Sequence, residues 1–170
     1  MALAHLLAAC GQGHCTLPLP SVKIMPSERI MSLVIPLRYW KYCQSEGSLW
    51  SPQGTKVGVG FSGHDVGVNN PSLQSAPNVG PIPQGVWMIA SEPQGPSHLG
   101  PLALALIPVT GTITFGRSGF FLHGDSTEDV LDHTKDASHG CLVFARVVRE
   151  QVLASPVKEL VVVEDENVQP

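Results

Sequence analysis

Residues 120–144 read FFLHGDSTEDVLDHTKDASHGCLVF, and this stretch joins an apolar strand to a second apolar segment through a polar connection. The run Phe120–Leu122 predicts a strand that leads directly into His123. The tetrapeptide Asp125–Glu128 has the pattern of a helix start, with a capping oxygen and an acid three residues later. We therefore expect a short helix that ends at about His133. Cys141 lies just before the second apolar segment.

The residues around Cys141 have the composition of a cysteine nucleophile. A cysteine thiol is mostly protonated at neutral pH and becomes a good nucleophile when a histidine lies within hydrogen-bonding distance. His123 and His139 are both candidates for that base. Gly140 permits a tight turn, which can direct the backbone N–H groups of residues 139–141 toward one point as an oxyanion hole. Ser138 can hydrogen-bond beside this turn.

The spacing of these residues is specific. His123 is followed by fourteen residues and then by Ser138-His139-Gly140-Cys141. This arrangement resembles the signature of the YkuD-like L,D-transpeptidases. Further segments resemble one branch of that family, the L,D-transpeptidase effector toxins delivered by type VI secretion. These segments are His123-Gly124-Asp125, Asn78-Val79-Gly80-Pro81-Ile82-Pro83, and Trp40 with Tyr42 followed by Gln44-Ser45-Glu46-Gly47.

The resemblance implies a fold, a substrate and a role for each matching residue. The fold is mainly β, an L,D-transpeptidase-like catalytic domain built as a sheet sandwich or barrel with one or two short helices. The substrate is a peptidoglycan stem peptide. Cys141 matches the nucleophile and His123 the general base, while the backbone carbonyl of Gly124 would orient that base. His139, Gly140 and Cys141 match the donors of the oxyanion hole, and Ser138 matches the Ser/Thr position.

The residues that would bind the substrate follow less directly from the pattern. Many family members carry an arginine two positions after the cysteine, whereas this chain has Val143. Binding of the substrate carboxylate would then fall to Arg117 or Arg146. His64 is a candidate for the lining of the cleft. Asp125 can orient His123, with helix capping as a competing role.

The implied reaction is acyl transfer from the third residue of a stem tetrapeptide. Cys141 would attack that carbonyl and expel the terminal D-alanine. Water, a free D-amino acid or a neighbouring stem amine would then take the acyl group, which gives carboxypeptidase, exchange or cross-linking activity. The sequence leaves this choice open.

Composition excludes several other classes of protein. The chain has 170 residues, a formal net charge of −4 and 14% charged residues, without a basic stripe. A nucleic-acid partner is therefore not expected. No apolar run has the length of a transmembrane segment. Gly and Pro number 17 and 15 without a repeat period, which predicts many turns between short strands.

The first part of the chain differs from the rest. Residues 1–30 predict a leader outside the fold, and residues 31–170 a single catalytic domain. Leu7–Cys10 resembles a lipoprotein cleavage box, but no Lys or Arg precedes it, so we expect no functional export signal. A substrate outside the cytoplasm then suggests delivery to a target periplasm by a secretion machine, with a carrier and an immunity protein as partners. Cys10 and Cys15 are expected to be free thiols without a functional role.

The remaining elements follow from apolar patterns bounded by Gly and Pro. A long loop is expected over residues 62–84 and a turn region over 47–55, with a helix over Ala145–Ala154, where Val147, Val148, Val152 and Leu153 form one side. Expected strands are Leu33–Tyr42, Lys56–Phe61, Val86–Ala90, Leu102–Ile107, Thr112–Phe115 and Leu160–Val163.

Four alternatives compete with this interpretation. A zinc site built from His123, His139 and Cys141 is the main rival chemistry; the family pattern has no metal, and we predict neither a metal nor a cofactor. A papain-type protease is disfavoured because its cysteine precedes its histidine in the chain. A housekeeping cell-wall L,D-transpeptidase would need an export signal. A non-catalytic cell-wall-binding module would keep the fold without depending on Cys141.

Overall fold

A computed structural model of the chain describes residues 38–125 and 137–168. The predicted leader and the predicted helix that ends at about His133 lie outside these residues, apart from Asp125 at its start. Cys10 and Cys15 also lie outside them. Within the described ranges, no helix combines the length and the apolar character that a bilayer crossing requires.

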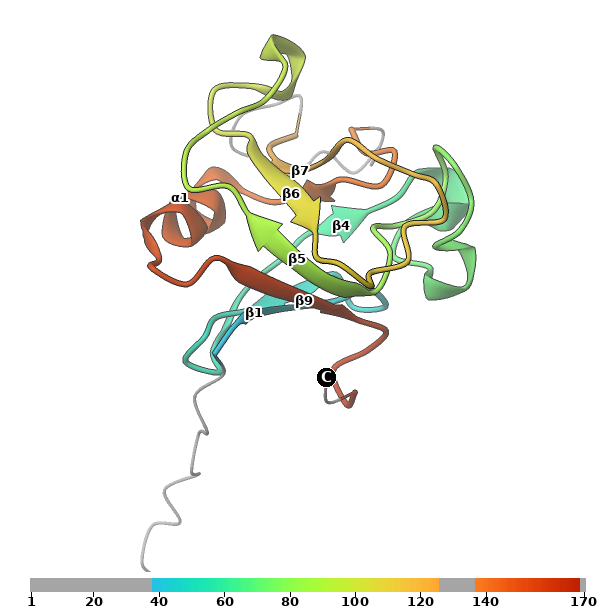
Figure 1. The fold of residues 1–170 in the computed structure, drawn as a ribbon, viewed down its shortest axis with the longest axis horizontal. Coiled ribbons are helices and arrows are strands. Elements are labelled where there is room, and N and C mark those ends of the chain that lie inside the picture. The colour runs from blue at the N-terminus through green and yellow to red at the C-terminus, as the bar shows by residue number, and fades with distance from the viewer. Residues whose placement is uncertain (1–37, 126–136, 169–170) are drawn as a thin grey trace, which may run out of the picture. The chain divides into compact units, whose positions relative to one another are not determined.

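The described residues form a mainly β domain, as predicted (Figure 1). Its nine strands are β1 Trp40–Cys43, β2 Ser48–Trp50, β3 Lys56–Val59, β4 Phe61–Ser62, β5 Gly85–Ile89, β6 Leu104–Pro108, β7 Phe120–His123, β8 Leu142–Val143 and β9 Glu159–Val163. The single α-helix among these residues is α1, Arg146–Ala154, and short 3-10 turns cover Asp65–Gly67, Pro71–Leu73 and Ser97–Leu99.

All nine strands belong to one sheet, in the order β3-β2-β1-β9-β5-β6-β7-β8-β4. The pairs β1–β9 and β7–β8 are parallel, and the others are antiparallel. The two strands at the ends of this order, β3 and β4, are joined through the single residue Gly60. The chain itself therefore brings the two ends of the sheet together, and the sheet curls into a nearly closed barrel.

Gly60 is required at this closure. A Cβ atom there would collide with the carbonyl oxygen of Val143 in β8 and would lie 2.9 Å from the ring of Phe144. The strand predicted over Lys56–Phe61 is accordingly two strands, which belong to opposite ends of the sheet order.

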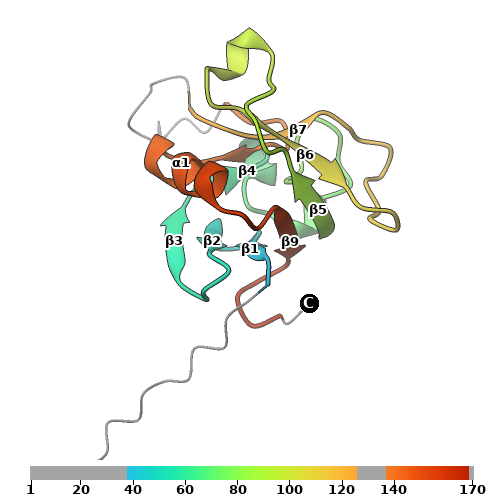
Figure 2. The ribbon, with the colours of Figure 1, turned by 60° about the vertical axis from the view of Figure 1, so that its left-hand side comes forward.

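The core fills the inside of the curled sheet. Its largest fully buried side chains include Trp87, Tyr42 and Phe144, and the rings of Trp87 and Phe120 pack edge to face at 5.0 Å. The helix α1 lies next to β3, where Val148 packs against Gly58 (Figure 2).

Most predicted elements are confirmed, with shifted ends. The predicted strands over Val86–Ala90, Leu102–Ile107 and Leu160–Val163 are β5, β6 and β9, and the predicted helix is α1. The strand expected over Leu33–Tyr42 is β1, which begins at Trp40; residues up to 37 lie outside the described part. On α1, Val148 and Val152 are buried as expected, but Val147 is 59% exposed.

One predicted strand is wrong and two strands were missed. Residues 112–115 form no strand, because Phe115 adopts φ 55° between the positive-φ residues Gly111 and Gly116. β2 lies inside the segment predicted as a turn region, and β8 directly follows Cys141. These two strands have three and two residues, too few for an alternating pattern to be visible.

Candidate active site

The predicted base ends strand β7, and the predicted nucleophile directly precedes its partner strand β8. They are parallel, with Leu122 opposite Leu142 and His123 opposite Val143. Leu122 and Leu142 are buried in the core. Because side chains alternate along a strand, His123 lies on the other face of the sheet. Cys141 directly precedes Leu142, so it lies at the start of the neighbouring strand, and its thiol is next to the backbone of Gly119 and Phe121.

His123 is held as a neutral imidazole with one tautomer. Its ring is 2% exposed, and its Nδ1 lies 2.6 Å from the carbonyl oxygen of Gly124. Since a carbonyl only accepts, Nδ1 carries the hydrogen. Its Nε2 is buried without a hydrogen-bond partner among the described residues. Burial lowers the pKa of His123, and the nearby charge of Arg149 lowers it further, while the Gly124 bond opposes this. The ring thus presents a free lone pair at Nε2.

The Cys141 thiol is protonated at rest. Its Sγ lies 3.7 Å from the carbonyl oxygen of Gly119. Burial raises the pKa of this thiol, whereas the backbone N–H of Phe121 and the charge of Arg117 oppose that increase. A thiol with a raised pKa needs a base to become a nucleophile.

Ser138 organises the turn that carries Cys141. The side chain is fully buried, and its Oγ accepts hydrogen bonds from the N–H groups of Gly63 (3.1 Å) and Gly140 (3.0 Å). The same hydroxyl donates to the carbonyl of Cys141 at 2.7 Å. The hydroxyl is therefore saturated. The Gly140 N–H, predicted as an oxyanion donor, is occupied by Ser138.

A second buried serine, Ser62, fixes the next peptide. Its Oγ donates to the carbonyl of Gly140 at 3.0 Å and accepts from the N–H of Ile82 at 2.8 Å. In a planar trans peptide the C=O and N–H point in opposite directions. Since the Gly140 carbonyl points inward to Ser62, the N–H of Cys141 points away from Ser62. Sequence analysis did not identify Ser62; its only signal was its place at the end of a short strand, before Gly63.

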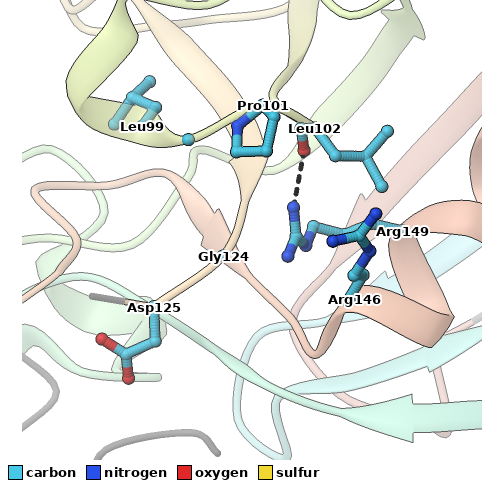
Figure 3. A pocket seen from close by; sticks show the side chains of 8 residues that line it. Leu99, Pro101, Leu102, Gly124, Asp125, Arg146 and Arg149 are labelled. Carbon is cyan, nitrogen blue, oxygen red and sulfur yellow. Dashed lines mark hydrogen bonds between the residues drawn. The ribbon is translucent and has the colours of Figure 1, made fainter. Parts of the chain in front are cut away.

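The predicted substrate residues separate into two groups. His64 and Arg117 lie beside the cysteine turn: the ring of His64 packs edge to face on that of His139 at 5.2 Å, and Arg117 donates to the carbonyl of His139. Asp125 and Arg146 instead line a small cavity of about 40 Å³ next to Gly124 (Figure 3). The Asp125 carboxylate points away from Arg146 there, and Arg146 bonds Glu150 at 2.9 Å.

Two larger cavities flank the site. One of about 280 Å³ is lined by Cys141 and His139, with Phe115 and Arg117 at its wall. The other, of about 310 Å³, is lined by His123 together with Gly124, Asp125 and the 97–100 segment. The nucleophile and the base therefore face separate cavities.

A metal centre gains no support from the geometry. Among residues 38–125 and 137–168, no three histidine, cysteine or acidic side chains come close enough together to hold a metal ion. The free cysteines in this part of the chain are Cys141 and Cys43, and Cys43 is buried in β1.

The described residues thus form a barrel-like sheet in which His123 ends β7 and the Ser138-His139-Gly140-Cys141 turn leads into the parallel strand β8. Residues 56–165 match the Tlde1 domain. The chain therefore belongs to the Tlde1 domain family, the L,D-transpeptidase effectors of type VI secretion, and the predicted effector branch is confirmed. The upstream segments that suggested this branch, from Trp40 to Gly47, lie outside the matched range. No curated protein and no solved structure matches the chain.

Proposed function

We propose that this protein is a cysteine enzyme that modifies peptidoglycan. It acts on stem tetrapeptides at the bond between the third residue, an L-centre, and the terminal D-alanine. The observation that carries the proposal is the β7–β8 register, which pairs the strand that ends in His123 with the strand that Cys141 directly precedes. Membership of the Tlde1 domain family supports the substrate class.

In the first step, Nε2 of His123 accepts the proton of the Cys141 thiol. The thiolate attacks the carbonyl carbon of the third residue, and the electron pair of the C=O bond moves to the oxygen. When the tetrahedral intermediate collapses, the C–N bond breaks and His123 returns the proton to the leaving nitrogen. D-alanine leaves, and the stem remains attached to Cys141 as a thioester. The lowered pKa of His123 and the lack of a hydrogen-bond partner for its Nε2 among the described residues support this role.

The negative charge of the intermediate needs donors near Cys141. The N–H of Cys141 is the principal candidate, because the inward bond between Gly140 and Ser62 turns it the other way. The N–H of His139 is the second candidate. Gly140 contributes through its backbone conformation, with φ 125°, and not through its own N–H, which Ser138 occupies.

Substrate contacts are proposed on both sides of the dyad. His64 borders the cysteine turn through its contact with His139. Asp125 lines the cavity on the His123 side, and Arg146, which lines the small cavity next to Gly124 with Asp125, is the candidate for a substrate carboxylate. The acyl-enzyme then reacts with water, with a D-amino acid or with a neighbouring stem amine.

Delivery to the periplasm of a target cell completes the proposal. Its support is the type VI effector family and the location of peptidoglycan outside the cytoplasm. A carrier in the secretion machine and an immunity protein are the partners implied. Expression with an added periplasmic signal should be toxic, whereas cytoplasmic expression should not. Equal growth in both cases would contradict this part of the proposal.

The reaction is tested by incubating purified peptidoglycan tetrapeptides with wild-type protein, with and without a free D-amino acid, followed by mass spectrometry. Loss of the terminal D-alanine indicates hydrolysis, and its replacement indicates exchange. Cys141→Ala and His123→Ala should abolish both products. Cys43→Ala is the matched control, since it removes the other described free cysteine, which is buried in β1. A folded wild-type sample without either product would favour the binding-module alternative.

A further inference from the structure

The guanidinium of Arg117 is bonded to backbone carbonyl groups of two separate segments. Its Nη1 donates to Gln74 at 2.6 Å and to Pro81 at 2.7 Å. Its Nη2 donates to Gly80 at 2.8 Å and to His139 at 3.1 Å. These four bonds use both hydrogens of both Nη groups. The two-pronged contact by which an arginine binds a carboxylate is therefore already occupied, and Arg117 is poorly suited to the substrate-carboxylate role predicted from the sequence.

Arg117 is also packed tightly against the cysteine turn. A Cβ atom at Gly140 would collide with Nη2 of Arg117 and would lie 3.1 Å from the ring of Phe120. The guanidinium carbon lies 5.1 Å from the centre of that ring, a cation–π contact. Gly140 is therefore the residue that allows the guanidinium to reach the turn.

These contacts fix one peptide plane from both ends. The carbonyl of His139 accepts from Arg117, and the N–H of the same peptide, that of Gly140, donates to Ser138. The following peptide is fixed by Ser62. Two successive peptides before Cys141 thus have set orientations. Arg117 links the turn to the 74–81 segment, and Ser62 links it to Ile82, the residue directly after that segment.

The charge of Arg117 acts on Cys141 as well. Both residues line the same cavity, and the positive charge favours the thiolate. A guanidinium held by four carbonyl groups stays charged and immobile, so its field at the sulfur is constant.

We propose that Arg117 is a positioning residue, which clamps the cysteine turn to the 74–81 segment and so fixes the thiol and the N–H of Cys141. The inference rests on the proposed function for its catalytic consequence. The clamp itself concerns the geometry and reactivity of Cys141, which can be measured without peptidoglycan.

The experiment compares wild type, Arg117→Lys and Arg117→Met. Lysine keeps the charge but cannot hold four carbonyl groups, and methionine removes both. Lys158→Met is the matched control, since Lys158 also donates to two backbone carbonyl groups, those of Val152 and Leu153, at the end of α1. Each variant is measured at a temperature at which circular dichroism shows it folded. The milder Arg117→Lys keeps the test decisive if Arg117→Met does not fold.

The first readout is the rate at which iodoacetamide alkylates Cys141 as a function of pH. We expect the apparent pKa of alkylation to rise in Arg117→Met and to rise less in Arg117→Lys. The second is turnover, where kcat should fall by about 10²-fold in both variants with little change in KM, because misplacement of the reacting group is the defect. Lys158→Met should match wild type in both.

Two results would overturn the clamp. An unchanged alkylation profile and kcat in both variants would show that Arg117 does not position Cys141. A rise in KM alone, with kcat and alkylation unchanged, would restore Arg117 as a substrate-binding residue. If wild type itself lacked L,D-activity, the proposed function would fail, while the alkylation profiles would still decide the inference.

Discussion

A Cβ atom at Gly124 would lie 2.7 Å from Nη2 of Arg149. Arg149 is itself immobilised, because its Nε donates to the carbonyl of Phe144 at 3.0 Å. Its Nη1 also donates to the carbonyl of Leu102 at 2.8 Å, as Figure 3 shows. The guanidinium therefore cannot retreat without losing these bonds. Gly124 also supplies the carbonyl that accepts from Nδ1 of His123. The absence of a side chain at Gly124 thus bears directly on the orientation of the base.

Gly124→Ala should lower both stability and activity. The added methyl group must displace Arg149 or the backbone of Gly124, and overpacking of this kind costs about 1–3 kcal/mol. Displacement of the Gly124 carbonyl would release His123, so kcat should fall further than the loss of folded protein explains. The measurements are thermal unfolding and D-alanine release per folded molecule.

The control for that variant is Gly111→Ala. A Cβ at Gly111 meets no atom within 4 Å, but φ there is +98°, so the substitution strains the backbone away from the dyad. It should lower the melting temperature and leave turnover per folded molecule unchanged. Equal turnover in Gly124→Ala and Gly111→Ala would contradict the link between Gly124 and His123.

Ser138→Ala should disable the cysteine turn, whereas Ser138→Thr should preserve it. Alanine leaves the buried N–H groups of Gly63 and Gly140 without their acceptor, and each unsatisfied group costs about 1–3 kcal/mol. Threonine retains the hydroxyl. The free energy of unfolding in urea and the rate of D-alanine release are measured for both variants. Ser45→Ala is a matched control, since it removes an exposed serine that donates to the carbonyl of Glu164.

Similar losses of stability in Ser138→Ala and Ser45→Ala would show that the hydroxyl of Ser138 is not required for the turn. Loss of activity in Ser138→Thr, with normal stability, would place the requirement on the size of the side chain instead.

The sequence indicated the candidate base and nucleophile but not the contacts that hold their backbone. His123 and Cys141 were found because spacing along one short segment carries the signal, and β7 and β8 then pair directly. The bond from Ser62 to Gly140 joins residues 78 positions apart, and that from Arg117 to Gln74 joins residues 43 apart. No local pattern encodes such pairs. The positioning role that we propose for Arg117 could not be inferred from the sequence for this reason.

In the fold, too, local features were predicted from the sequence and long-range ones were not. The longer apolar runs that became β5 and β9 were predicted, because their residues pack into the core. The short strand β8 was not, since it is stabilised by pairing with β7 and β4 on both sides rather than by its own pattern. Barrel closure through Gly60 depends on strands from distant parts of the chain and could not be seen in the sequence.

Gln44→Leu should destabilise the fold without a direct effect on the dyad. Gln44 is fully buried, its Nε2 donates to the carbonyl of Ile82 at 2.6 Å, and its Oε1 accepts from Gln84 at 2.9 Å. Leucine leaves the Ile82 carbonyl unsatisfied, so the free energy of unfolding should fall by about 1–3 kcal/mol. Gln53→Leu, at an exposed position, should change it little. Equal stability of the two variants would show that the Ile82 carbonyl finds another partner.

The pH dependence of the reaction should reflect the shifted pKa of His123. The base must be neutral to accept the Cys141 proton, and burial lowers the pKa of His123 below its ordinary value of about 6.5. Activity should therefore persist below that pH and fall only when the pH drops through the lowered pKa. If His123 and Cys141 interact, the apparent pKa at which kcat/KM falls on the acid side describes the two groups together and not His123 alone.

Arg149→Lys tests a secondary cause of that shift, since burial lowers the pKa of His123 most and the charge of Arg149 lowers it further. Lysine keeps a positive charge but loses the bonds that hold the guanidinium, so the charge at position 149 should lie farther from His123. The pH at which kcat/KM falls on the acid side should then rise toward the ordinary pKa of histidine. In wild type this pH should lie below about 6.5. A wild-type fall at or above that value would mean that His123 is not the buried neutral base, and that His139, the exposed histidine beside Cys141, has to be considered for the role.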